Sequence, residues 1–274
     1  MLKKNDFLRL IYNTGVENTD VVKPLLLPSL GFKINSMSPT LNLSKIGGYP
    51  PIIKEDWSFL KEKPFLFLGQ ISLDQIREKN NLLPQNGILC FFLLVDDIGY
   101  RYPDRKGEFK VVYIESPVQN VINEEVVTIK ERSISFFEYY TFPSYQESIL
   151  QHINLNEEDL NIIVDIIQEI QYSITGSFDV SHQVLGHPQA VQGTVRFWWA
   201  AKYLGFEDKT SFSEEEIKLI NDEEEKFILL LQLNMGDPNI EIDYFGDSIA
   251  YFGIHKDDLH NMNFEKVILV MQST

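Results

Sequence analysis

The chain has 274 residues, of which 44% are hydrophobic and 12% aromatic, so it can bury a substantial core and is not a disordered protein. Its 24 basic and 40 acidic side chains give a formal net charge of −16. This charge argues against binding to nucleic acid and to anionic membranes, since both carry negative charge themselves. It favours a basic partner, or it serves only solubility.

A single cysteine cannot form an internal disulfide, so no oxidising compartment is implied. The residues after Lys3 and Lys4 lack the apolar core of a signal peptide. No run approaches the ~20 apolar residues that a membrane span requires. We therefore expect a cytoplasmic protein.

The N-terminal part of the chain predicts one helix, one interrupted apolar run and three strands. Residues 5–12 have helical periodicity and end at a glycine, Gly15. The next apolar run contains Pro24 and Pro28, which predicts an edge strand or an extended loop over residues 21–30. Residues 36–51 are typical of an irregular loop. Apolar runs then predict three strands, at residues 65–71, 88–95 and 109–114.

The remaining elements alternate between helices and strands. A strand is expected over residues 133–141, and a helix over about 156–171 with Asn156 as its N-cap. Residues 191–203, with Trp198 and Trp199, predict a buried helix. An acidic helix follows, in which Ser213 and Glu216 form a capping box. Three more strands are expected at residues 227–233, 249–252 and 264–269.

The two sets of three strands resemble each other, and each follows a turn that ends in proline. Gln70 and Gln232 occupy the same place in the first strand of each set, and Pro50 and Pro188 end the two turns. Matched elements in the same order predict an internal duplication. We expect an α+β fold of largely antiparallel sheets with several packing helices. The chain would be a single compact domain, residues 1–274, with lobes at about 30–150 and 175–274 and the helix of residues 156–171 between them.

The paired glutamines are the first candidates for a site. Strict alternation places Gln70 on the same strand face as Leu66 and Leu68, and Gln232 on the face of Ile228 and Leu230. A buried amide needs hydrogen-bond partners, so a structural role in a nearby loop is one interpretation. The other is a pair of amides that face a ligand cleft shared by the lobes.

Other candidates each have a plainer interpretation. Asp237, Asp243 and Asp247 have the oxygens of a calcium site but not the EF-hand spacing, so a hairpin turn is favoured and no metal is predicted. His182 and His187, with Asp179 nearby, lack a second ligand cluster for zinc. Cys90 lies in an apolar run without basic neighbours, which favours buried packing. Trp57, Trp198, Trp199, Arg196 and Lys202 would suit base stacking, but core packing is favoured.

Several short motifs in a fixed order resemble the YwqG-like family of bacterial proteins. In the first half they lie at residues 44–50 with Trp57, at 67–71 and at 87–92. In the second half they lie at residues 185–188, 192–193, 230–233 and 245–247, and at 257–259 with Phe264. The resemblance runs from about residue 30 to the end. Phe245, where the family usually has tryptophan, and Pro51, Ile52 and Ile53, in place of Leu-Pro, depart from the pattern.

The resemblance implies a bacterial, cytosolic α+β protein of unknown function. Relatives often lie near secreted-toxin and immunity genes, which suggests an immunity-type binding role. We therefore expect a non-catalytic protein-binding module with an acidic surface and without a cofactor. The acidic segment of residues 207–225 is the best candidate for docking a basic protein.

The alternative is a small-molecule-binding protein or an enzyme with a cleft between the lobes. The residues expected to line that cleft are Gln70, Gln232, Asp247 and His187. No nucleophile elbow, phosphate loop or dinucleotide fingerprint is present, so the sequence decides neither for nor against an enzyme. The oligomeric state and the identity of any ligand are likewise not predicted.

Overall fold

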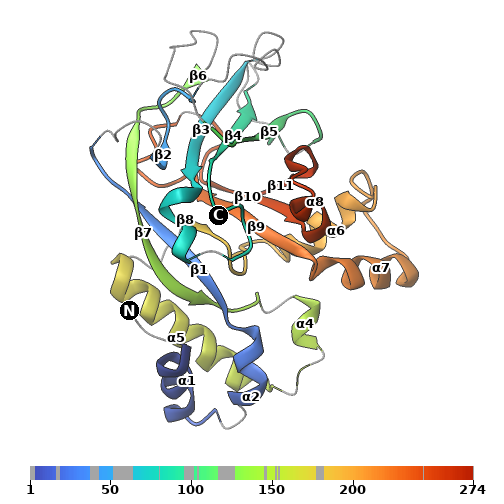
Figure 1. The fold of residues 1–274 in the computed structure, drawn as a ribbon. Coiled ribbons are helices and arrows are strands. Elements are labelled where there is room, and N and C mark those ends of the chain that lie inside the picture. The colour runs from blue at the N-terminus through green and yellow to red at the C-terminus, as the bar shows by residue number, and fades with distance from the viewer. Residues whose placement is uncertain are drawn as a thin grey trace.

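In the computed structural model, the strands form one long sheet with helices around it (Figure 1). The structure describes residues 4–16, 19–37, 43–51, 64–79, 81–95, 102–103, 105–116, 127–144, 147–151, 153, 155–176, 182–242 and 244–273. The helices are α1 (Lys4–Asn13), α2 (Thr19–Val22), α4 (Ser148–Gln151), α5 (Glu157–Thr175), α6 (Val195–Tyr203), α7 (Glu214–Glu224) and α8 (Lys256–His260). Short 3₁₀ turns include η1 (Lys23–Leu25) and η4 (Phe264–Lys266).

The strands are almost entirely antiparallel, and β1 and β7 lie in the middle of the sheet. In chain order they are β1 (Leu27–Ile34), β2 (Lys45–Ile46), β3 (Phe65–Ser72), β4 (Ile88–Leu94), β5 (Phe109–Ile114), β6 (Val127–Thr128), β7 (Arg132–Thr141), β8 (His182–Val184), β9 (Phe227–Asn234), β10 (Ser248–His255) and β11 (Ile268–Ser273). In space the order is β11-β10-β9-β8-β1-β7-β2-β3-β4-β5, and β6 pairs with β3. The α+β prediction with largely antiparallel strands is therefore confirmed.

The sheet folds back on itself, so its two halves pack face to face around one core. In this core the rings of Phe91 (β4) and Phe252 (β10) lie 5.1 Å apart, and those of Tyr113 (β5) and Phe264 (η4) stack at 5.4 Å. Burial of such apolar surface is the main stabilising contribution to a domain of this size. Figure 1 shows the same arrangement, with β3, β4 and β5 above β9, β10 and β11.

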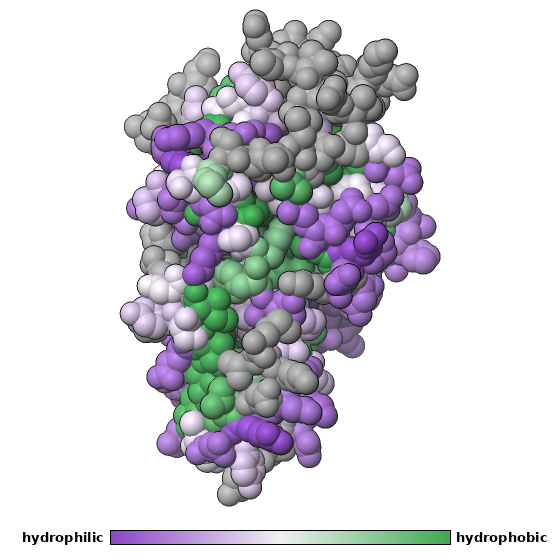
Figure 2. All heavy atoms as spheres, turned by 60° about the vertical axis from the view of Figure 1, so that its left-hand side comes forward, coloured by the Kyte–Doolittle hydropathy of each residue, from purple (hydrophilic) through white to green (hydrophobic). Residues whose placement is uncertain are grey.

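A helical layer of α1, α2 and α5 covers the lower end of β1 and β7 (Figure 1). The carboxamide of Asn156 accepts the backbone N–H of Asp159 and so caps α5, and Gly176, in the left-handed conformation, ends it. Phe7, Ile11 and Ile163 are fully buried in the separate apolar cluster of this layer. Figure 2 shows apolar residues in a strip at the level of this layer, between hydrophilic residues.

The helices α6 and α7 pack on the outer face of the second half of the sheet. Trp199 is fully buried there and donates its indole N–H to the carbonyl of Tyr251. Core packing of Trp199, rather than a stacking surface, is confirmed. The capping box of Ser213 and Glu216 begins α7 as predicted.

Two predicted boundaries were wrong for local reasons. The run with Pro24 and Pro28 was expected to be an edge strand or a loop, but its second half forms β1 in the sheet centre. Pro28 pairs only with β7, because the pairing of β1 with β8 on its other side begins at Leu30. The missing N–H of Pro28 therefore does not interrupt the hydrogen bonds between β1 and β8. The last strand runs from Ile268 to Ser273 rather than over residues 264–269, because the η4 turn occupies its expected start.

None of the helices among the described residues combines the length and the apolarity that crossing a membrane requires.

Candidate functional site

The two glutamines lie on the outer faces of the sheet, not on the core face that alternation predicted. In β3 the extra residue of a β-bulge is Leu68, because Phe67 pairs with Phe92 and Gly69 with the next residue, Phe91. In β9 the pairing with β10 likewise skips Leu230. A bulge inserts one residue and so reverses the alternation beyond it. Gln70 therefore faces outward beside Cys90 on β4, and Gln232 beside Tyr251 on β10.

Each glutamine holds the irregular segment next to its own half of the sheet. Gln70 donates its side-chain N–H to the carbonyl of Leu43 at 2.7 Å, and its buried Oε1 has no partner among the described residues. Gln232 accepts the backbone N–H of Gln189 at 2.8 Å. The structure therefore does not bring the two amides together, and each anchors a different loop.

Two other buried side chains, which sequence reasoning missed, organise the prolyl turns. Lys45 donates from Nζ to the carbonyl of Tyr49 at 2.8 Å, and Gln183 donates from Nε2 to the carbonyl of His187 at 2.8 Å. Each stands two residues before a pair of left-handed residues, Gly47 with Gly48 and Leu185 with Gly186. The signal in the sequence was this common spacing, a long polar side chain two residues before the turn.

His187 belongs to a buried cluster with an acid and a guanidinium. Its Nε2 is 2.8 Å from the carbonyl of Leu25, and its Nδ1 is 3.8 Å from a carboxylate oxygen of Glu147. The same oxygen is 3.7 Å from Nε of Arg196. His187 Nδ1, Glu147 Oε1 and Arg196 Nε are buried without a hydrogen-bond partner among the described residues. At these distances Arg196 and Glu147 form an ion pair without a direct hydrogen bond, and His187 lies beside the same carboxylate. Water or a ligand could bond the polar atoms that this arrangement leaves.

Glu224 at the end of α7 extends this cluster to α4. Its carboxylate accepts the backbone N–H of Ser148 at 3.0 Å and also the Ser148 hydroxyl. Burial raises the pKa of Glu224, and nearby Glu147 acts in the same direction, whereas Ser148 and Arg196 oppose the rise. Burial lowers the pKa of His187, so its neutral form is favoured. The cluster joins the helical layer to α6, α7 and the second turn.

Asp247 is exposed and lies away from this cluster, in the loop before β10. In the same loop Asp237 accepts a hydrogen bond from His182 Nε2 at 2.8 Å, while His182 Nδ1 accepts the backbone N–H of Asn234. Burial of Asp237 opposes ionisation, but the bonds from His182 and Asn239 outweigh it and lower its pKa to about 2. These bonds connect β8 with the loop after β9, as expected of a structured turn. Asp179, Asp243 and Trp57 lie outside the described residues.

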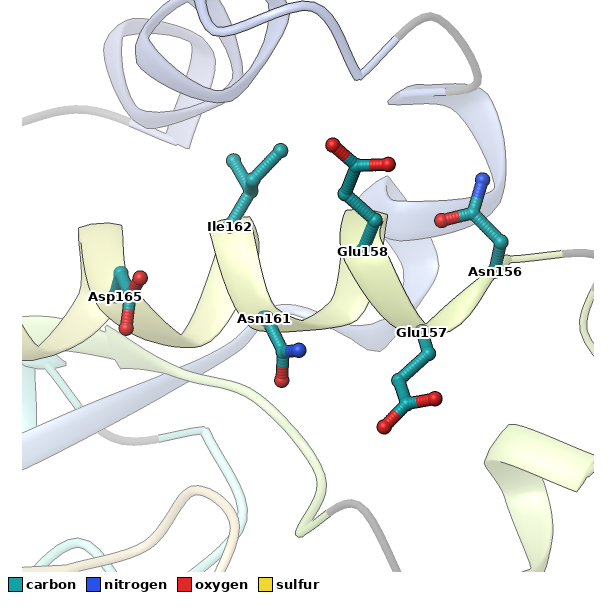
Figure 3. Close-up of a pocket in the computed structure, with 6 residues that line it drawn as sticks. All are labelled: Asn156, Glu157, Glu158, Asn161, Ile162 and Asp165. Carbon is teal, nitrogen blue, oxygen red and sulfur yellow. The ribbon is translucent and has the colours of Figure 1, made fainter.

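The remaining candidates for chemistry are inert or dispersed. Burial raises the pKa of the Cys90 thiol, which opposes the thiolate that a nucleophile requires. Among the described residues, no three His, Cys, Asp or Glu side chains are placed to hold a metal ion together. A shallow hollow of about 570 Å³ lies beside the start of α5. Figure 3 shows its side chains diverging from that one helix, with Glu158 and Ile162 on one side and Glu157 and Asn161 on the other.

The acidic helix α7 presents an apolar residue within a ring of carboxylates. Nine acidic residues and two lysines lie between Glu207 and Glu225. Leu219 is 54% exposed, and every helical neighbour three or four positions away is acidic. These neighbours are Glu215, Glu216, Asp222 and Glu223. Glu216 and Glu223 pair with Lys209 and Lys226, whereas Glu215 and Asp222 on the exposed face have no ion pair with any described residue.

Together these features define an α+β protein with a folded-over antiparallel sheet, anchored prolyl turns and a charged, partly apolar helix surface. The chain belongs to the family defined by the domain of unknown function DUF1963, whose model matches residues 44–273. A comparison with curated proteins gives no match.

Proposed function

We propose that the protein is a non-catalytic binding module that docks a basic protein through α7. The observation that carries this proposal is Leu219, an exposed apolar side chain inside a ring of carboxylates. An apolar anchor provides affinity when a partner covers it, and surrounding charges select the partner and speed its encounter. Figure 1 shows α7 on the side of the molecule, away from the helical layer, where a partner can reach it.

The chemistry of the surface specifies the partner. Glu215 and Asp222 would meet lysine or arginine side chains, and Leu219 would enter an apolar hollow between them. A partner without basic residues would leave these carboxylates desolvated and unpaired, which costs binding free energy. The proposal includes the bacterial cytoplasmic setting and the immunity-type role that the YwqG-like resemblance implies.

The test is affinity capture from extracts of the host cell with wild-type protein and two charge-reversal variants. Glu215→Lys with Asp222→Lys reverses the exposed charges beside Leu219. Glu158→Lys with Asp165→Lys, on α5, is the matched control because both pairs are exposed acids seven positions apart on a helix. Bound proteins are identified by mass spectrometry at low and high salt.

We expect one basic protein to bind the wild type and the α5 variant at low salt but not the α7 variant. High salt should weaken that binding, since the steering charges are on the surface. Leu219→Ser should then raise its dissociation constant by about tenfold or more. If no protein distinguishes the wild type from the α7 variant, the proposal is wrong.

We also infer that the two halves of the sheet derive from an internal duplication within one domain. Outward from the central β1 and β7, the order β2, β3, β4, β5 on one side matches β8, β9, β10, β11 on the other. Both bulges come two residues before the paired glutamine, at Leu68 and Leu230. Lys45 pairs with Gln70 as Gln183 pairs with Gln232. Shared pairings and bulges support a common origin better than apolar strand patterns do.

The second candidate function is a small-molecule-binding protein or an enzyme, as the alternative sequence prediction has it. The cluster of His187, Glu147 and Arg196 favours it, because three buried polar atoms there lack partners among the described residues. Of the residues proposed to bind a ligand, His187 lies in this cluster, whereas Gln70, Gln232 and Asp247 lie elsewhere. A thermal-shift screen with metabolites tests it, since ligands that bind the native state raise its melting temperature. A flat response across a broad panel would contradict it.

A further inference from the structure

A pocket of about 340 Å³ lies between the middle of α5, the end of β7 and the segment that follows the second prolyl turn. None of the described residues that line it is charged, although the chain has 64 charged side chains. Val164 and Ile167 on α5, Phe142 after β7 and Val191 give it apolar walls. Gln168, Gln171 and Gln189 add three side-chain amides. The pocket therefore combines apolar contact with groups that both donate and accept hydrogen bonds.

The wall on the side of the sheet is held in place by buried polar side chains. Gln189 bonds Gln171 on α5 at 2.8 Å from its side chain and Gln232 on β9 at 2.8 Å from its backbone N–H. Its carbonyl accepts the hydroxyl of Tyr251 at 2.7 Å. Gln272 on β11 accepts the backbone N–H of Val191 at 2.8 Å. A segment without regular secondary structure is thus fixed from three strands before any ligand binds, which reduces the entropy cost of binding.

We propose that this pocket binds a small uncharged molecule that combines a branched aliphatic group with a carboxamide. A charged ligand would lose hydration in the pocket without gaining a counter-charge, so nucleotides, free amino acids and carboxylic acids are disfavoured. The aliphatic group fits the walls formed by Val164, Ile167 and Phe142. The carboxamide matches the side-chain amides because each can donate and accept. The volume is near the lower end for ligand pockets and suits a molecule of about dipeptide size.

The test compares three similar probes by ligand-observed NMR near neutral pH. N-acetyl-leucinamide is neutral, N-acetyl-leucine is an anion and leucinamide is largely a cation. We expect saturable binding of the neutral probe with a dissociation constant in the millimolar range, as befits its size. Each charged probe should bind at least about tenfold more weakly than the neutral probe. The same affinity for all three, or no binding of the neutral probe, would overturn the proposal.

Two variants locate the binding. Ala190→Phe should fill the pocket and abolish binding, and a thermal unfolding curve shows whether this variant folds. Gln168→Glu keeps the size of an exposed rim residue but adds a charge, so it should weaken the neutral probe and improve binding of leucinamide. Gln192→Glu is the matched control, since Gln192 is exposed and does not line the pocket. Equal effects of the two Gln→Glu changes would place the binding elsewhere and contradict the proposal. These outcomes are independent of docking at α7.

Discussion

The two prolyl turns have the same backbone bond, made in one case by a charged side chain and in the other by a neutral one. In the first turn the ammonium of Lys45 bonds the carbonyl of Tyr49 and the carboxylate of Glu131 at 2.6 Å. In the second, the amide of Gln183 bonds the carbonyl of His187 and accepts the hydroxyl of Tyr139. Glu131 is 32% exposed, whereas Gln183 is fully buried. The charged side chain is therefore found in the turn where its counter-ion reaches water. The neutral amide is found in the turn where a buried charge would have no contact with water.

Exchanging the two side chains should have unequal effects. Gln183→Lys places an ammonium between β1 and β9 without a carboxylate partner, and we expect it to reduce the free energy of unfolding by about 3–5 kcal/mol. Lys45→Gln leaves Glu131 partly hydrated and should cost only about 1–2 kcal/mol. Urea unfolding of both variants measures the difference. A loss for Lys45→Gln as large as that for Gln183→Lys would show that the exposure of Glu131 does not set the two turns apart.

Glycine substitutions should show how tightly each turn is packed. A Cβ at Gly186, which has φ +78°, would lie 2.5 Å from the hydroxyl of Thr141, and one at Gly47 would lie 2.5 Å from the backbone carbonyl of Lys130. Gly176, at φ +76°, has nothing within 4 Å and serves as the control. We expect Gly176→Ala to cost about 1 kcal/mol from backbone strain alone. Gly186→Ala should cost about 2–3 kcal/mol through strain and overpacking together.

Gly47→Ala should destabilise at least as much as Gly186→Ala, because a backbone carbonyl cannot rotate away as a side chain can. Melting temperatures of the three alanine variants give the order. Equal decreases in melting temperature for Gly176→Ala and Gly186→Ala would show that the second turn can accommodate a Cβ without a clash.

A smaller effect should follow from the side chains that accept a backbone N–H beside each turn. In the first half of the sheet, Ser44 accepts the backbone N–H of Ser72 at 2.8 Å. In the second half, His182 accepts the backbone N–H of Asn234. Ser44→Ala leaves a buried N–H without its acceptor and should cost about 1–2 kcal/mol. Ser173→Ala, at an exposed site on α5, should change stability by less than about 0.5 kcal/mol. Chemical denaturation of the two variants tests this, and similar small losses would mean that water replaces the Ser44 hydroxyl.

The sequence predicted those parts of the fold that depend on neighbours along the chain. Asn156 and Ser213 cap their helices as expected, because capping requires only the next three residues. The faces of Gln70 and Gln232 were wrong because one extra residue in each strand reverses all later positions. Apolar runs do not mark such a bulge.

The buried charges could not be predicted, since their partners are distant in sequence. Glu147 and Glu224 look like ordinary surface acids in the sequence, but they meet Arg196 and Ser148 only when the helical layer packs against α6 and α7. The sequence makes His187 a candidate for lining a cleft, but its contact with Glu147 depends on the same packing. Residues that join separate layers of the fold are therefore found only from the structure.

The second turn, unlike the first, should make stability depend on pH, because His187 is buried behind it. The pKa of His187 is lowered in the folded protein from its usual value of 6.5. As the pH decreases below 6.5, the unfolded chain therefore binds a proton before the folded protein does, and the free energy of unfolding decreases. This loss ends at the lower pKa of the folded state. The pKa of Glu224 is raised from 4.5, so its contribution has the opposite sign and is lost as pH rises through its folded value.

His187→Gln should therefore flatten the decline in the free energy of unfolding just below pH 6.5, whereas Glu224→Gln should steepen the decline towards acid pH. Denaturant unfolding at several pH values between about 4 and 8 separates the two contributions. If His187→Gln leaves the decline in the free energy of unfolding unchanged, the burial of His187 beside Glu147 and Arg196 does not contribute to the pH dependence of stability. The first turn is the internal control, since Tyr49, not a histidine, holds the corresponding place before Pro50. The difference between the turns would then lie in their charges rather than in their shared backbone geometry.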